Sequence, residues 1–276
     1  MQNDLIVNEI FDSFAAANPN RHPNRISPSL LGHDCAAFVW YAFNWCFELP
    51  KVNGRMAKYN ARGNVEEANV IAAMRATGWQ VQETGHDGNQ ISIEAFSGHL
   101  YGMVDGICSH PTHTGGVNYL FENKFVNTRR FIAFTNDSLQ KVDAKYYGQI
   151  QLYMHFLKLP ACVWAVTNRN DDDMRVFIIP YDENYANDLI AFADTLLTSK
   201  ARLKRISSKP TFFKCIYCDA RDVCHGEKPI EVNCRSCVNS FPLPNASWGC
   251  RLAPNDNQTI PKEFLPRGCS NHSPVQ

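Results

Sequence analysis

Hydrophobic and polar residues follow two different periods along this chain. Apolar positions spaced three to four residues apart predict helices at 30–47, 63–77, 142–157 and 189–206. Alternating or β-branched runs between turn residues predict strands at 91–96, 100–108, 117–126, 161–168 and 174–180. This order of elements predicts an α/β fold in which helices flank a mixed central sheet.

The regular patterns do not reach either end of the chain. A short amphipathic stretch from Leu5 to Phe14 and a linker rich in Asn, Pro, Arg and His form an N-terminal lead-in at 1–25. After Pro210 the periodic patterns fade and cysteines become frequent. We therefore expect one folded domain at 26–226 and a small C-terminal module at 227–276.

Composition narrows the classes of protein to consider. The 276 residues are 45% hydrophobic, which excludes a disordered chain. Lys and Arg (27) balance Asp and Glu (27), so any nucleic acid must be held by a local basic patch or by bound metal ions. No apolar run approaches the ~18–20 residues of a membrane span, and we expect no membrane partner. The first ten residues lack the features of a secretory signal, so we expect a cytoplasmic chain, in the bacterial host if a phage encodes it.

Acidic residues and a lysine mark two of the predicted strands. Glu122 and Lys124 are two residues apart, so they project from the same face of their strand. Asp105 stands beside Gly106 in the preceding strand, and pairing of the two strands would bring Asp105 next to Glu122. Two such carboxylates can hold Mg²⁺ or Mn²⁺, with the lysine beside the cation. The alternative is a surface charge pair of no chemical role.

Three further features favour the chemical interpretation. Glu66 and Glu67 lie on the helix predicted at 63–77, and Gln149 and Tyr153 stand one helical turn apart after the strands. This order resembles the RecB-like branch of the PD-(D/E)XK nuclease superfamily. That branch has a helical Glu, a Gly-x-x-Asp-Gly strand, a Glu-x-Lys strand and a Gln-x-x-x-Tyr helix. The resemblance spans roughly residues 26 to 225.

The resemblance implies a restriction-endonuclease-like core and a role for each of these residues. Asp105 and Glu122 would bind the catalytic Mg²⁺ or Mn²⁺, and Lys124 would be the catalytic lysine. Glu67, favoured over Glu66 by its spacing from Gly63, would add a third carboxylate to the metal site. Gln149 and Tyr153 would position the nucleic acid or the lysine.

Cysteine spacing predicts a first metal site. Cys215, Cys218 and Cys224 form a compact C-x2-C-x5-C chelate with three thiolates, and Cys35 is the candidate for a fourth. The split arrangement resembles the 4Fe–4S site of the iron–sulfur RecB-like nucleases, which implies a structural cluster that clasps the end of the domain to its first helix. Alternatives are zinc on the same ligands, zinc with His225 in place of Cys35, or inert buried thiols.

A second set of cysteines lies in the C-terminal module. Cys234 and Cys237 form a C-x2-C pair, and Cys250, Cys269 and His272 follow. Four such ligands suit a structural Zn²⁺ ion, and we favour the four cysteines, with His272 as a substitute. The three cysteines left over are expected to be ordinary buried thiols: Cys46, Cys108 and Cys162.

The leading hypothesis is a divalent-metal-dependent DNA nuclease. It would be an exonuclease acting on a duplex end or a single strand in phage or bacterial recombination and repair, possibly beside a recombination partner protein. The chain has no helicase phosphate-binding motif and resembles stand-alone phage versions. Basic residues near the predicted site could contact phosphates, among them Arg129, Arg130, Lys141 and Lys145. The alternative is a catalytically idle nucleic-acid-binding or assembly module scaffolded by iron–sulfur and zinc.

Overall fold

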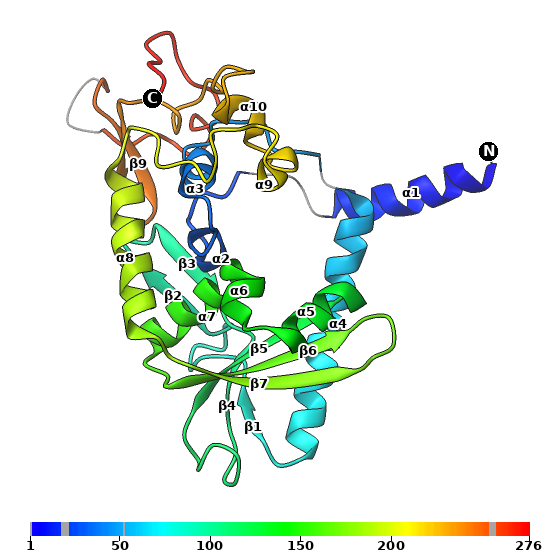
Figure 1. Cartoon of the computed structure of the whole chain (residues 1–276). Helices are drawn as coiled ribbons and strands as arrows, with labels where there is room; N and C mark the ends of the chain where they lie inside the picture. Colours follow the sequence, from blue (N-terminus) through cyan, green and yellow to red (C-terminus); the bar gives the residue numbers. More distant parts are fainter. Residues whose placement is uncertain (1, 18–21, 52, 254–257) are drawn as a thin grey trace.

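The computed structural model describes residues 2–17, 22–51, 53–253 and 258–276. Its centre is a five-stranded mixed sheet in the order β1-β4-β5-β6-β7 (Figure 1). β5 and β6 are parallel, and the other neighbours are antiparallel. The strands are β1 (Gln80–Gln82), β4 (Gly106–Ser109), β5 (Tyr119–Val126), β6 (Ala161–Asn168) and β7 (Met174–Pro180).

Helices cover both faces of this sheet, as the burial of all eight residues of β6 requires. On one face, α4 (Gly54–Ala76) packs Val70 and Ile71 against Phe121. On the other, apolar residues of three helices pack against Leu120 and Trp164. These helices are α5 (Thr128–Asn136), α6 (Leu139–Val142) and α7 (Ala144–Leu157). The predicted α/β class, with helices flanking a mixed sheet as in a restriction-endonuclease-like core, is confirmed.

The strand predicted at 100–108 is two strands in different sheets. β3 (Leu100–Met103) pairs with β2 (Ser92–Ala95) in a separate antiparallel hairpin, and β4 starts at Gly106 in the central sheet. Between them, the Asp105 carboxylate accepts a hydrogen bond of 2.8 Å from the backbone N–H of Asn123. The Asp105 side chain thus accepts a hydrogen bond from the backbone of β5, at the point where the backbone pairing of β4 with β5 would otherwise continue.

The single helix predicted at 30–47 is also divided, into α2 (Pro28–Leu31) and α3 (Ala36–Phe43). Gly32 ends α2 directly against α7, where a Cβ atom on Gly148 would lie 2.6 Å from the Gly32 Cα atom. The two glycines let these segments meet through their backbones. The break also places Cys35 at the N-cap of α3.

Several other boundaries differ from the periodic pattern because capping residues set them. Asn53 caps α4 through its side chain, so the helix predicted at 63–77 begins at Gly54. Asp182 caps α8 (Glu183–Thr198), which starts and ends earlier than the predicted 189–206. The Leu5 to Phe14 stretch lies within α1 (Gln2–Ala16), which extends outward from its contact with α4 (Figure 1).

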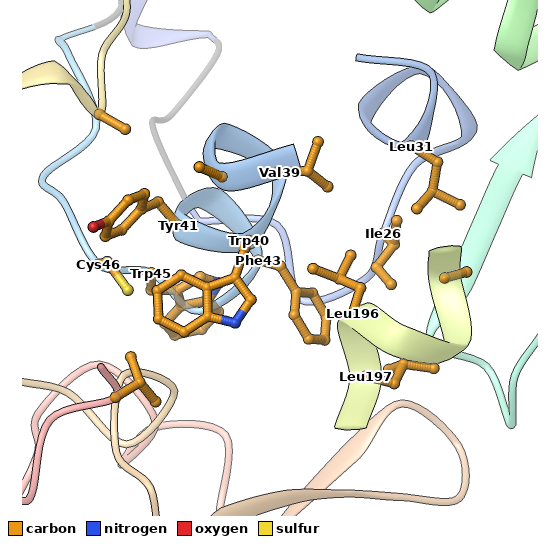
Figure 2. Close-up of a cluster of buried hydrophobic side chains, with 14 of the residues drawn as sticks. Ile26, Leu31, Val39, Trp40, Tyr41, Phe43, Trp45, Cys46, Leu196 and Leu197 are labelled. Carbon is orange, nitrogen blue, oxygen red and sulfur yellow. The ribbon is translucent and has the colours of Figure 1, made fainter. Parts of the chain in front are cut away.

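The described residues after 226 gather with α3, α9 (Phe213–Ile216) and α10 (Arg221–Cys224) at one end of the molecule (Figure 1). They contain a hairpin of β8 (Ser240–Leu243) and β9 (Ser247–Cys250) that the sequence pattern did not predict. Trp248, Leu265 and Val275 belong to the same buried cluster as α3 and α8. Figure 2 shows this cluster, with Trp40 and Phe43 beside Leu196.

In the part of the chain that the structure describes, no helix combines the length and apolar composition needed to cross a membrane.

Candidate active site and cysteine groups

The structure brings the predicted carboxylates and lysine together on β5. Glu122 and Lys124 share one face of this strand, and the Lys124 Nζ atom donates a 2.5 Å hydrogen bond to Glu122 Oε1. The same Nζ atom lies 3.9 Å from Asp105 Oδ2, at the break between β3 and β4. Lys124 therefore sits between two carboxylates.

Glu122 is the most constrained member of this cluster. Its side chain is 1% exposed, and Gln149 of α7 donates a second hydrogen bond of 2.7 Å to its Oε1 atom. Its Oε2 atom is buried and has no hydrogen-bond partner among the described residues. A buried carboxylate oxygen without a partner is costly, so this atom is the natural ligand for a cation.

The electrostatics of the cluster also favour a bound cation. Burial, together with the nearby carboxylates of Asp105 and Glu67, raises the pKa of Glu122 to about 8 against the opposing effect of Lys124. Burial and Asp105 likewise raise the pKa of Glu67 to about 7. Three carboxylates facing one lysine leave negative charge that a divalent ion would offset.

Lys124 stays charged in this environment. Burial alone would lower its pKa, but Glu122 and Asp105 hold it above its ordinary value. The ammonium also lies 5.2 Å from the ring centre of Tyr146, a cation–π contact. Lys124 is thus held as a fixed cation at the edge of the carboxylate cluster.

The helical residues of the predicted site have distinct positions. Glu67 of α4 interacts electrostatically with Asp105, Glu122 and Lys124. Gln149 contacts Glu122, as described above. Tyr153 lies 3% exposed, and its hydroxyl donates a 2.7 Å hydrogen bond to the carbonyl of Met103. Tyr153 therefore contacts the end of β3, two residues before Asp105, instead of the lysine.

The first group of cysteines meets in one small cavity. Cys35 at the start of α3 faces Cys215, Cys218 and Cys224, and His225 lines the same cavity. Burial, together with the other three cysteines, raises the pKa of Cys218 to about 11. Burial also raises the pKa of Cys224, against the opposing effect of Arg205, which lines the cavity too. Deprotonation of four thiols this close would require a compensating cation.

The second group lines another small cavity beside the β8–β9 hairpin. The ligands proposed from the sequence all contribute to it: Cys234, Cys237, Cys250, Cys269 and His272. Burial raises the pKa of Cys234, and the neighbouring cysteines act in the same direction. The Nε2 atom of His272 lies 3.0 Å from the Ser236 hydroxyl, so this nitrogen is already engaged in a hydrogen bond.

The three leftover cysteines line neither of these cavities, and all three are buried. Burial raises the pKa of Cys46 and of Cys108 to about 12, so both remain neutral thiols.

Within the described ranges, no set of three or more His, Cys, Asp or Glu side chains is already spaced as ligands around one ion. In the carboxylate cluster, Glu122 Oε1 is hydrogen-bonded to Lys124 and Gln149, and Oε2 is the oxygen that a cation would meet. The chemistry of the donors nevertheless fits: hard oxygens for Mg²⁺ or Mn²⁺ in one place, and soft thiolates for iron or zinc in two others.

A cavity beside Lys124 contains basic residues that the sequence did not single out. Arg55 and Arg169 line it together with Arg130, which was a candidate phosphate contact, and with Tyr59 and Tyr146. Arg55 belongs to α4, whereas Arg169 follows β6. No local pattern marks two arginines from distant segments, so only the folded structure shows that they meet.

Comparison with known proteins gives loose structural likenesses. No family model matches the chain, and no curated protein matches it. One solved structure, of the protein SSO0001, covers 81% of this chain and 98% of its own, at 12% identity and a TM-score of 0.46. Two others are of LHK-Exo, described in one as an alkaline exonuclease from Laribacter hongkongensis and in the other as a complex with dAMP. The dAMP complex covers 67% of this chain and 89% of its own, at 17% identity and a TM-score of 0.41. The other covers 67% and 92%, at 15% identity and a TM-score of 0.39. TM-scores this low assign no function.

Proposed function

We propose that this chain is a divalent-metal-dependent nuclease that hydrolyses phosphodiester bonds in DNA, acting as an exonuclease. The observation that carries the proposal is the partnerless, buried Oε2 atom of Glu122, placed beside Asp105, Glu67 and Lys124. In a solvent-facing charge pair, both carboxylate oxygens would remain hydrated instead of one being buried without a partner. In a metal site, the cation is the partner of the buried oxygen.

In this proposal, Asp105, Glu122 and Glu67 hold Mg²⁺ or Mn²⁺. The bound cation supplies Lewis acidity for phosphodiester hydrolysis. Gln149 holds the Glu122 carboxylate in one orientation through its 2.7 Å hydrogen bond. Tyr153 helps to hold Asp105 in position, since its hydrogen bond to the Met103 carbonyl anchors the end of β3 next to Asp105.

Lys124 acts on the substrate itself. Its ammonium is a fixed cation that donates to Glu122 Oε1 in the metal-free state. With Asp105, Glu122 and Glu67 holding a cation, the ammonium would be free to orient the attacking water and to stabilise negative charge on the phosphate oxygens. In the metal-free cluster the raised pKa keeps the lysine protonated, and in this proposal it serves as an electrostatic stabiliser.

The two cysteine groups have structural roles in the same proposal. A 4Fe–4S cluster on Cys35, Cys215, Cys218 and Cys224 would join the start of α3 to α9 and α10. A Zn²⁺ ion on Cys234, Cys237, Cys250 and Cys269 would hold the irregular tail. What supports both is that the four thiols of each group line one cavity. A phage or bacterial recombination pathway, with a partner protein, rests on the sequence resemblance alone.

The deciding experiment is a time course on end-labelled linear DNA and on circular DNA, with Mg²⁺ or Mn²⁺. We expect metal-dependent loss of linear DNA, and no cleavage by Asp105→Ala or Glu122→Ala. The matched control is Glu94→Ala, which removes a half-exposed carboxylate from β2, away from the cluster. Metal-dependent binding without cleavage of any DNA would support the idle binding module and overturn the nuclease.

A further inference from the structure

A second cavity lies beside the carboxylate cluster, at the carboxyl ends of the two parallel strands. Its volume is about 490 Å³. Val126 ends β5, and Arg169 directly follows the end of β6. The complete lining is Asn53, Arg55, Met56, Tyr59, Asn60, Val126, Asn127, Arg130, Tyr146 and Arg169. The carboxyl ends of parallel strands are a common place for ligands in α/β folds.

The charge of this cavity is one-sided. Its lining contains three arginines, and no acidic residue of the described chain is part of it. Arg130 pairs with Asp143, which lies outside the lining. Arg55 and Arg169 make no ion pair with any residue whose position the structure describes. Such guanidinium groups are suited to an anion, and their planar donors match the oxygens of a phosphate.

Aromatic rings hold two of the arginines in place. The Arg169 guanidinium lies 4.6 Å from the ring centre of Tyr59, and that of Arg130 lies 5.2 Å from the ring centre of Tyr146. A cation–π contact of this kind occupies the flat face of the guanidinium and not the N–H groups at its edge. Arg130 already donates one of these N–H groups to Asp143, and its other N–H groups can donate to a ligand. The arginines are therefore oriented before any ligand arrives.

Two helices add to the positive potential. α4 and α5 both begin at the cavity, since their N-cap residues Asn53 and Asn127 line it. The positive ends of both helix dipoles lie there, in addition to the arginine charges. The ligand favoured by this environment is an anion with several oxygens.

The cavity adjoins the proposed catalytic lysine. Tyr146 forms part of its wall, and the same ring lies 5.2 Å from the Lys124 ammonium. We propose that this three-arginine cavity binds a phosphate of the DNA strand next to the bond being cleaved, and so fixes the position of that bond over the carboxylates. The proposal rests on the nuclease function proposed above. The phosphate is either a terminal monoester or an internal diester, because guanidinium groups recognise both.

Binding of DNA without added Mg²⁺ tests the cavity independently of catalysis. The full-length protein is titrated against labelled oligonucleotides by fluorescence anisotropy, over a range of salt concentrations. Arg55→Gln and Arg169→Gln should each weaken binding by about tenfold or more, as expected when a charged hydrogen bond to phosphate is lost. Each should also reduce the slope of log K against log salt by about 0.7 on single strands.

The matched control is Arg267→Gln. Arg267 is an exposed arginine of the C-terminal tail, and it does not line the cavity. We expect its removal to change affinity less than twofold. Circular dichroism checks the fold of every variant. If Arg169→Gln is unfolded, the exposed Arg55, which packs only against the Phe11 ring among the contacts described, carries the test alone.

Strands with and without a terminal phosphate distinguish a site for a terminal monoester from a site for an internal diester. A loss of affinity confined to strands with a terminal phosphate indicates a monoester site, whereas an equal loss on phosphorylated, unphosphorylated and circular strands indicates a diester site. Either result supports the cavity. Equal affinities of Arg55→Gln, Arg169→Gln and Arg267→Gln for all strands would overturn it. Normal DNA binding without cleavage would instead refute the nuclease and leave the cavity intact.

Discussion

Arg235 is the residue whose substitution we expect to reveal how the C-terminal tail is held. It lies between Cys234 and Cys237, is completely buried, and reaches out of the tail into the core. Its guanidinium carbon is 3.7 Å from the ring centre of Trp248, 4.6 Å from that of Phe43 and 4.9 Å from that of Trp45. It also donates a hydrogen bond to the carbonyl of Phe43 in α3.

The contacts give a magnitude for Arg235→Ala. A desolvated cation–π contact contributes up to about 2 kcal/mol, and a hydrogen bond from a charged group about 1.5–3 kcal/mol. Truncation also leaves a cavity among three aromatic rings. Burial of the charge opposes these gains, and it lowers the pKa of Arg235. We therefore expect the free energy of unfolding to fall by about 3–5 kcal/mol, within the range of large core truncations.

Urea denaturation of the metal-loaded protein, followed by tryptophan fluorescence, measures this loss. Arg235→Met should cost less than Arg235→Ala, because an apolar side chain of similar length fills the space without a buried charge. Arg251→Ala is the control in the same tail, since Arg251 is exposed and 5.5 Å from the ring centre of Phe241. A loss below about 1 kcal/mol for Arg235→Ala, equal to that of the control, would contradict the reasoning, because removal of a buried cation should be far more costly.

Three further predictions concern the metal sites. Lys124→Ala should retain Mn²⁺ binding, measured by calorimetry, while the cleavage rate falls by about two to three orders of magnitude, as when a positioned electrostatic stabiliser is lost; an unchanged rate would exclude the proposed role. The rise in melting temperature on adding Mg²⁺ should be larger at pH 8.5 than at pH 5.5. The pKa values of Glu67 (about 7) and Glu122 (about 8) lie above their ordinary 4.5. Protonation of these carboxyls therefore stabilises the metal-free fold at acidic pH, and this stabilisation is lost as the pH rises to 7 and 8. At that pH, Mg²⁺ replaces the protons. Equal shifts at both pH values would argue against metal binding at these carboxylates. Cys35→Ala should remove iron and the broad absorbance near ~400 nm of an iron–sulfur cluster while elemental analysis still finds zinc; iron retained in this variant would mean that another residue completes the first site.

Local sequence was sufficient for the strand that carries Glu122 and Lys124. Alternation along β5 puts Glu122 and Lys124 on one face, because successive side chains of a strand point to opposite sides. The close spacing of Cys215, Cys218 and Cys224 is likewise a local property, and the three do line one cavity. The α/β class followed from the order of helical and extended patterns. In each case residues near in sequence determine the geometry.

Tertiary packing decided the rest, because it depends on contacts between segments far apart in the chain. The strand at 100–108 divides because the Asp105 side chain takes a hydrogen bond from Asn123, and the helix at 30–47 divides where Gly32 meets Gly148. Neither contact can be predicted from the local spacing of hydrophobic residues. The same holds for the cavity of Arg55, Arg130 and Arg169, whose three arginines come from three separate segments and meet only where β5, β6, α4 and α5 end or begin.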